Sequence, residues 1–406
     1  MLKKHYHWIV CIACTLLVFC NMGLCSTIIT VYLPFIEAQG ISGAMGSAII
    51  SVRCISSFIC TFIVALFFDR ISLRSGTALA TLLGAVGYII FAAGGSIFAY
   101  YAGSVIFGIA YCFGCMIPVS LIITNWFSGK KALALGICTT GSGFSTMIFA
   151  PLMTSIITKH GLRTAFIFAA VFIAVCAAVT FTLIRNTPED LSLKPYGTAE
   201  TAKEVRYSDR KHGPTGFEYF IMAVMMIVMG GAAIGYSSHI SILITTNGYS
   251  HETAALSVSL FGVMLIIGKL IFGQVADRLR ALKTSAIFLC TFVVGCLPSI
   301  FMDGKNMLMC FALPVLLGLG SPVYTIGPSL WSADLASKEY YAKVLQWLLI
   351  FYNLGGIMFT SVPGIIADHT GEYVTSFIMF AAMAAVTMIL LIWCYASAKK
   401  HARAGR

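Results

Sequence analysis

The sequence predicts an all-α membrane protein in which twelve transmembrane helices form two pseudo-symmetric six-helix bundles. The first observation is composition: the 406 residues are 59% hydrophobic and only 10% charged. A soluble protein of ordinary composition carries about 25% charged residues. The second observation is a series of long apolar runs, because a spanning helix needs about 20 such residues. The third is that short motifs recur in the two halves of the chain.

Twelve apolar stretches define the expected helices in chain order. The first follows Lys3 and Lys4 and is too long for the apolar part of a signal peptide, so we interpret it as a spanning helix. The expected spans of the first half are 8–35, 44–67, 77–96, 98–126, 132–157 and 164–185. Those of the second half are 217–245, 252–276, 284–302, 307–332, 342–366 and 373–396.

One connection differs from the short loops between the other helices. The segment 186–216 is polar and charged, and it contains Pro188, Pro195 and Pro214. Such a composition near the middle of the chain is typical of a linker between domains. We therefore expect an N-terminal bundle at 1–185, a cytoplasmic central loop at 186–216 and a C-terminal bundle at 217–406.

Motifs recur about half a chain length apart. Phe-Phe-Asp69-Arg70 follows the second expected helix, and Val-Ala-Asp277-Arg278 follows the eighth. Pro151 and Pro363 lie in the fifth and the eleventh. An internal repeat of this length is typical of transporters built from two bundles, which hold their substrate near the membrane midplane.

The formal net charge of +11 reports membrane topology. If the N-terminus is cytoplasmic, most Lys and Arg residues lie in the expected inner loops and tails, and only Lys159, Arg163 and Lys305 lie in outer loops. This bias places both termini in the cytoplasm. The basic balance is thereby explained without nucleic acid as a partner, and the lipid bilayer is the expected surrounding.

The 14 cysteines lie almost entirely in apolar helices. Cys11–Cys14 and Cys112–Cys115 have a C-x-x-C spacing, but small packing residues are the more frequent meaning of this pattern inside a membrane helix. We expect no disulfide framework, no metal site and no cofactor.

Six plus six helices, a long central loop and the repeated Asp-Arg loops resemble the major facilitator superfamily. The resemblance covers the whole chain, although Ser72 and Arg280 stand where the family has Gly. In that family this loop helps to lock the cytoplasmic gate. The gate candidates that the resemblance implies are Asp69, Arg70, Arg74, Asp277 and Arg278; ordinary positive-inside charges are the alternative explanation.

A narrower resemblance rests on two segments. Asn-Trp126-Phe127-Ser-Gly-Lys130-Lys131, followed by Gly141-Ser-Gly143, is similar to the helix 4–5 region of monocarboxylate and oxalate/formate transporters. Thr187-Pro-Glu-Asp-Leu-Ser-Leu-Lys-Pro-Tyr196-Gly resembles the loop after helix 6 in bacterial members. The resemblance implies transport of small organic anions and a place in the bacterial cytoplasmic (inner) membrane.

Two cations lie deep inside the expected helices: Arg53 in the second and Lys269 in the eighth. A cation at the bilayer centre costs roughly 2.5–3.5 kcal/mol, and no Asp or Glu lies at similar depth to neutralise either one. We infer that an anionic substrate supplies the negative charge. Lys269 also stands four residues before Gly273, where the family usually has an Arg that pairs with the substrate carboxylate.

The two cations differ in depth. Measured from Asp69 and Asp277, Arg53 lies about 12 Å further into its helix than Lys269 does, at 1.5 Å per residue. One elongated anion or two successive binding stations would both fit this difference, and snorkelling to a surface is the alternative for Lys269. Further candidates for the cavity lining are Tyr32, Tyr236, Tyr324 and Asn353. His239 suits proton coupling by its ordinary pKa, with a packing role as the alternative.

The sequence thus predicts a monomeric secondary transporter of small organic anions that works by alternating access and is not an enzyme. The expected helices contain no Asp or Glu that could relay protons. Anion exchange needs no proton relay, so antiport is favoured, and proton symport through His239 is the alternative. A drug or cation exporter of the same fold would need an acidic residue in the cavity. A non-transporting membrane sensor is the third reading.

Overall fold

The computed structural model describes residues 5–94, 96–127, 131–197, 215–337 and 340–404. The chain divides into two compact units. Unit 1 comprises Met1–Ile41 and Ala48–Lys203, and unit 2 comprises Ser42–Ser47 and Glu204–Arg406. The division in the middle of the chain falls within the expected linker, whereas the grouping of Ser42–Ser47 with unit 2 was not expected.

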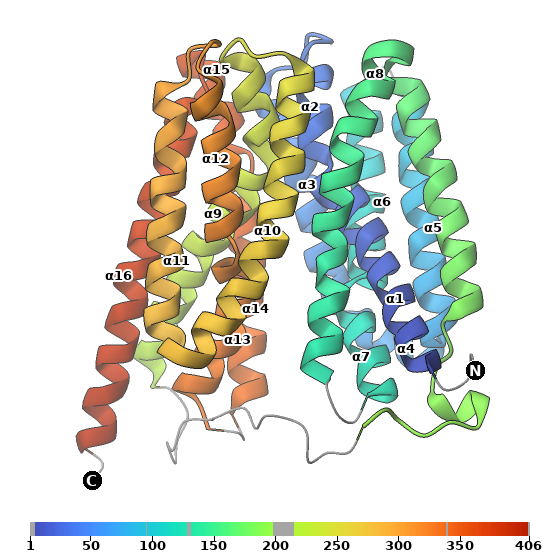
Figure 1. The fold of residues 1–406 in the computed structure, drawn as a ribbon, viewed down its shortest axis with the longest axis vertical. Helices are drawn as coiled ribbons and strands as arrows, with labels where there is room; N and C mark the ends of the chain where they lie inside the picture. The colour runs from blue at the N-terminus through green and yellow to red at the C-terminus, as the bar shows by residue number, and fades with distance from the viewer. Residues whose placement is uncertain (1–4, 95, 128–130, 198–214, 338–339, 405–406) are drawn as a thin grey trace. The chain divides into compact units, whose positions relative to one another are not determined.

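Unit 1 is all-helical apart from one isolated backbone bridge in the described residues. Its elements, in the order in which Figure 1 labels them, are α1 (Tyr6–Val18), the π-helix η2 (Phe19–Thr27), α2 (Ile29–Glu37), α3 (Gly43–Thr61), α4 (Val64–Arg70), α5 (Leu73–Ala92), α6 (Ile97–Gly114), α7 (Met116–Trp126), α8 (Lys131–Leu183) and the short η3 (Pro188–Leu191).

Unit 2 is also built from helices. They are α9 (Gly216–Thr246), α10 (His251–Leu279), α11 (Ala281–Cys296), η5 (Leu297–Phe301), α12 (Met307–Gly320), α13 (Pro322–Leu335), α14 (Tyr341–Phe359), α15 (Val362–Thr370) and α16 (Val374–Ala404). Thr215 and Glu218 begin α9 with a reciprocal capping box, so that the first helix of the unit starts at a defined residue.

Eleven helical segments in the described residues are long and apolar enough to cross a membrane. One of them, Ala134–Leu183, has 50 residues, more than twice the length of about 20 residues that a single crossing needs. Gly161 interrupts it with a positive φ of 83°, and α8 turns back on itself in Figure 1. Counted as two crossings, α8 yields the twelve expected passes, and the protein is a multi-pass integral membrane protein.

Several of these spans in the described residues are interrupted along their length, and three of them bear on the site. The span Tyr6–Glu37 contains the π-helix η2, Ile97–Trp126 is broken at Cys115, and Met307–Leu335 is divided at Ser321. At Cys115 the φ and ψ angles of −116° and −127° are not helical. Such irregular backbone at membrane depth is tolerated where it is buried in protein or lines a cavity, and π-helices are frequent at functional sites.

One packing contact repeats in the two units. A Cβ atom added at Gly108 of α6 would lie 2.6 Å from Cβ of Ser56 and 2.8 Å from the backbone nitrogen of Ser57, and it would also strike the carbonyl oxygen of Arg53. Added at Gly318 of α12, it would lie 2.9 Å from the Phe261 carbonyl oxygen, 2.6 Å from Cβ of Met264 and 3.1 Å from the Leu265 nitrogen. The same pattern of backbone and side-chain atoms meets each glycine, so the sequence repeat is also a repeat in packing.

Candidate substrate site

Arg53 lies on α3 inside unit 1 and is only 5% exposed. The close approach of α3 to α6 at Gly108 fixes the helix at this turn, and Ser56 adds a hydrogen bond from its hydroxyl to the carbonyl oxygen of Val105, 2.8 Å long. A guanidinium group has five N–H donors. Nη2 of Arg53 donates to the Cys54 sulfur over 3.1 Å, and Nε is buried without a hydrogen-bond partner among the described residues.

An aromatic ring lies over this buried charge. The Arg53 Cζ atom is 5.4 Å from the centre of the Tyr111 ring, which comes from α6 one turn after Gly108. Tyr111 lies four residues before the non-helical Cys115. The guanidinium therefore lies near the end of α6, where the break between α6 and α7 follows. A buried cation with an unused N–H is a suitable partner for a carboxylate, which can accept such bonds.

Lys269 has a different environment on α10 of unit 2. Its side chain is half-buried, and the preceding Gly268 packs against the junction of α12 and α13. A Cβ at Gly268 would lie 2.9 Å from the Gly318 carbonyl oxygen and 3.0 Å from Cγ of Pro322. In the packing repeat, Phe261 occupies the position that Arg53 has in unit 1. Lys269 follows Phe261 by two helical turns, so the two cations are not equivalent.

Tyr236 and Tyr324 belong to one aromatic cluster in unit 2. The Phe292 ring packs 4.8 Å from Tyr236 and 5.0 Å from Tyr324, measured between ring centres. The Tyr236 hydroxyl donates to Ser321 Oγ over 2.5 Å, at the junction of α12 and α13. The Tyr324 hydroxyl is buried and has no hydrogen-bond partner in the part of the chain that the structure describes. Of the two, Tyr324 thus retains a hydroxyl that could bind another group.

Tyr32 and Asn353 lie elsewhere. Tyr32 is fully buried in unit 1, where its hydroxyl is 3.1 Å from that of Tyr88 and its ring packs 5.1 Å from Phe166. Asn353 on α14 of unit 2 is half-buried and donates from Nδ2 to the Leu349 carbonyl oxygen over 2.8 Å. Neither contact brings these residues to Arg53 or Lys269, and their role in binding stays a prediction.

His239 is fully buried in unit 2, and both ring nitrogens have partners. Nδ1 is 2.8 Å from the Gly235 carbonyl oxygen, and a carbonyl only accepts, so Nδ1 carries a proton in this bond. Nε2 is 2.9 Å from Ser47 Oγ, and the ring stacks on Tyr373 at 5.7 Å. The contact with Ser47 explains part of the grouping of Ser42–Ser47 with unit 2.

The gate candidates show a mixed pattern. Asp69, Arg70 and Arg278 are exposed, and the side chain of Asp277 lies outside the described part of the structure. Arg74 is tied to the end of α8: Nε donates to the Phe181 carbonyl oxygen over 2.7 Å, and the guanidinium lies 4.1 Å from the Phe181 ring centre. This contact within unit 1 gives Arg74 a structural role, whereas a gating role for these residues stays a prediction.

The two segments that carry the narrower resemblance contact each other in unit 1. The Tyr196 backbone nitrogen donates to the Trp126 carbonyl oxygen over 2.9 Å, and Trp126 Nε1 donates to the Arg185 carbonyl oxygen over 3.0 Å. His7 Nε2 is 2.8 Å from the Lys194 carbonyl oxygen. The loop after α8 is therefore held against the ends of α1 and α7.

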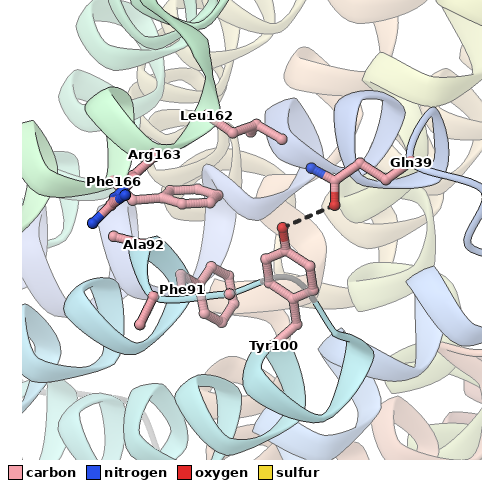
Figure 2. A pocket seen from close by; sticks show the side chains of 9 residues that line it. Gln39, Phe91, Ala92, Tyr100, Leu162, Arg163 and Phe166 are labelled. Carbon is pink, nitrogen blue, oxygen red and sulfur yellow. Dashed lines mark hydrogen bonds between the residues drawn. The ribbon is translucent and has the colours of Figure 1, made fainter.

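A cavity of about 340 Å³ lies in unit 1 apart from Arg53. Figure 2 shows it between the rings of Phe91, Tyr100 and Phe166, with Gln39 on the opposite side. The Tyr100 hydroxyl donates to Gln39 Oε1 over 3.2 Å, as the dashed line marks. This bond holds the loop between α2 and α3 on unit 1. In Figure 2 the Arg163 guanidinium points away from the Tyr100–Gln39 pair.

Sequence reasoning missed two groups of residues near these sites. Tyr111 and Gly108 position Arg53, and their spacing of three residues along one helix is the only sign of a common face. Ser47 contacts His239, and Asp368 contacts Gly43, in each case across a long stretch of sequence, and no local pattern indicates either contact.

An all-helical membrane protein with an internal repeat, interrupted spans and a buried unpaired cation has the features of a secondary transporter. The family model of the major facilitator superfamily matches residues 14–301 and 220–406. The chain belongs to this superfamily, whose members are transporters rather than enzymes.

Similar proteins carry transporter names. Monocarboxylate transporter 12 of Xenopus laevis is 24% identical over 396 residues, which cover 92% of this chain and 85% of the relative. The Homo sapiens protein of the same name is 23% identical, over 95% of this chain and 79% of its own length. These relatives are eukaryotic, so the expected bacterial membrane stays a prediction.

Solved structures show the same fold. The nucleoside transporter NupG has a TM-score of 0.73 at 14% identity, over 96% of this chain and 99% of that chain. An inward-facing, occupied bacterial homologue of the human lysosomal transporter Spinster has a TM-score of 0.67 at 13% identity, over 99% of this chain and 97% of its own. At such identity the likeness concerns the fold alone.

Proposed function

We propose that this protein is a secondary transporter of small carboxylate anions and that Arg53 binds the carboxylate. The observation that carries the proposal is the buried guanidinium whose Nε has no partner. An uncompensated cation at this depth costs several kcal/mol, and a bound carboxylate would offset that cost. The names of the relatives, monocarboxylate transporters, support the same substrate class.

Lys269 is the second anion-binding residue of the proposal. It is a compact point charge without the bidentate geometry of arginine, and its two-turn offset from the position equivalent to Arg53 favours a separate station on the path. Tyr324 could contribute its unused hydroxyl to the same half. Antiport is the mode that we propose, because exchange of one anion for another needs no proton relay. A monomer with both termini in the cytoplasm completes the proposal.

Asp334 is one acidic residue that a cation exporter could use. Asp334, in the last turns of α13, is exposed and accepts a hydrogen bond from the Tyr395 hydroxyl over 2.9 Å. A carboxylate that is exposed and engaged in this way lacks the features of a buried cation site.

Counterflow in proteoliposomes tests the proposal. The vesicles are loaded with one unlabelled carboxylate from a panel of mono- and dicarboxylates, and entry of the labelled compound is measured for wild type, Arg53→Ala and Lys269→Ala. We expect counterflow in wild type, none in Arg53→Ala and a strong reduction in Lys269→Ala. Lys159→Gln and Lys305→Gln, which remove exposed cations, are the controls for net charge. Normal counterflow by Arg53→Ala would overturn the site.

A further inference from the structure

The cavity of unit 1 that Figure 2 shows lies where several helical spans end. The spans Tyr6–Glu37 and Leu73–Ala92 end beside it, and Ile97–Trp126 begins there. The turn of α8 at Gly161 directly precedes two of the lining residues. All the lining residues belong to unit 1. The cavity is therefore formed within a single unit, at the end of the bundle where its spans leave the membrane interior.

This cavity is separate from the surroundings of Arg53. Tyr100, which lines the cavity, and Tyr111, whose ring lies over Arg53, are both on α6. Between these two positions the helix rises about 16 Å, at 1.5 Å per residue. A ligand of one or two rings is too short to touch both tyrosines, and the proposed function leaves the cavity without a role.

Aromatic rings form the apolar wall of the cavity. The Phe91 ring of α5 lies 5.1 Å from that of Tyr100 and 5.4 Å from that of Phe166, measured between ring centres, with the planes at 87° and 74°. Gly94 leaves space over one of these rings, because a Cβ atom added there would lie 3.7 Å from Cζ of Tyr100. Offset and edge-to-face ring pairs attract each other beyond the area that they bury. The wall therefore favours a flat aromatic ligand.

The polar groups of the cavity are available as donors. The side chains of Arg163 and Gln39 are exposed, and Figure 2 shows the guanidinium and the amide on opposite sides of the rings. The Tyr100 hydroxyl donates to Gln39 Oε1, so this bond leaves the two N–H groups of Nε2 unused. Among the described residues that line the cavity, Arg163 is the only one with a charge. Exposed side chains change rotamer within nanoseconds, so the guanidinium can turn to a bound anion.

We propose that this cavity is a second ligand site, which binds a small aromatic anion. The ring of the ligand packs among Phe91, Tyr100 and Phe166, and its anionic group pairs with Arg163. The volume of about 340 Å³ lies at the lower end of the range of about 300–1,000 Å³ that small-molecule sites have, so a ligand of one or two rings fits. The proposal depends neither on Arg53 nor on transport.

Binding of 4-fluorophenylacetate, followed by fluorine NMR on the purified full-length chain, tests the second site. All variants carry Arg53→Gln, so that the proposed carboxylate site does not contribute. Ala93→Leu extends an exposed residue into the cavity, and we expect it to lower the affinity about tenfold by displacing the ligand ring from the aromatic wall. Arg163→Gln should lower it about threefold, because exposed ion pairs are weak.

Lys159→Gln is the matched control, because it removes an exposed cation of α8 that does not line the cavity. We expect it to leave the affinity unchanged. The melting temperature of each variant shows that it is folded. If the Arg53→Gln protein does not bind 4-fluorophenylacetate, or if neither Ala93→Leu nor Arg163→Gln weakens the binding, the second site is overturned.

The neutral compound 4-fluorophenylacetamide tests whether the site selects an anion. It keeps the ring and lacks the charge, so Arg163→Gln should weaken binding of the acid and leave binding of the amide unchanged. Gln39→Glu places a negative charge on the opposite side of the rings and should also weaken binding of the acid alone. Equal effects of these variants on both compounds would contradict an anion site. If counterflow shows no carboxylate transport, the proposed function fails, and these affinities still decide the second site.

Discussion

The two units share one packing contact and use it for different purposes. In unit 1, Gly108 lets α6 approach the backbone of Arg53, and the guanidinium lies under the Tyr111 ring. In unit 2, Gly318 lets α12 approach the backbone of Phe261, which packs in an aromatic cluster. The repeat thus preserves the scaffold, while the side chain at the shared position is a cation in one half and an apolar ring in the other.

This difference shows that a two-fold repeat need not give a two-fold binding site. The unit 2 cation, Lys269, lies two turns beyond the position of Phe261. The interrupted helices also differ: α7 begins at the non-helical Cys115, whereas α13 begins with helical angles at Ser321 followed by Pro322. Ser321 is already bonded by Tyr236. Unit 1, in contrast, has a buried guanidinium near its break, and we propose that the primary anion contact lies there.

The largest effect that bears on this comparison is expected from substitution of the two equivalent glycines. Gly108→Ala and Gly318→Ala each force two helices apart, and we expect each to cost about 1–3 kcal/mol of stability. Gly108→Ala should weaken carboxylate binding more than Gly318→Ala does, because it displaces Arg53. Melting temperature and carboxylate affinity are measured on the same samples. Equal losses of affinity in the two variants would remove the distinction between the halves.

Exchange of the cation types is the second test. Arg53→Lys keeps the charge but loses the planar fork that grips a carboxylate, so we expect about a tenfold loss of affinity. Lys269→Arg keeps the charge and adds N–H donors, so we expect a smaller change in carboxylate affinity. The affinities come from substrate competition in proteoliposomes. If Lys269→Arg loses more carboxylate affinity than Arg53→Lys does, the primary anion contact lies in unit 2 instead.

The two buried tyrosines of unit 2 offer a matched pair. Tyr236→Phe removes the bond to Ser321, and we expect a loss of about 1 kcal/mol. Tyr324→Phe removes a hydroxyl without a partner, so stability should stay the same or rise slightly. Thermal unfolding in detergent measures both. If Tyr324→Phe keeps its stability and binds carboxylate less tightly, the hydroxyl is a ligand contact; a loss of stability comparable with that of Tyr236→Phe would contradict the description of Tyr324.

The smallest effect is expected at Tyr111. A cation over an aromatic face gains about 0.5–2 kcal/mol, and more of this range where the cation is desolvated. Tyr111→Phe keeps the ring and should leave carboxylate affinity within a factor of about two, whereas Tyr111→Leu should lower it about threefold. If Tyr111→Phe and Tyr111→Leu change the carboxylate affinity equally, the aromatic ring does not position Arg53.

Much of this architecture could be predicted from the sequence, because apolar length and isolated charges are local signals. The twelve crossings follow from run length, and Arg53 stands out because no acid lies near it. The π-helix of η2, the break at Cys115 and the place of Tyr111 could not be foreseen, because each depends on packing between distant helices. The partner of Tyr32 could not be foreseen either: its hydroxyl lies 3.1 Å from that of Tyr88, and its role in binding stays a prediction.

Direct binding by purified protein tests the central claim most closely. Wild type, Arg53→Gln and Lys305→Gln are titrated with the carboxylate panel while thermal stability is recorded. A ligand at 100 times its Kd adds about 2.7 kcal/mol to the folded state, so we predict a concentration-dependent rise in the melting temperature of wild type and Lys305→Gln and none for Arg53→Gln. The same rise in folded Arg53→Gln would contradict the assignment of Arg53 as the residue that holds the carboxylate.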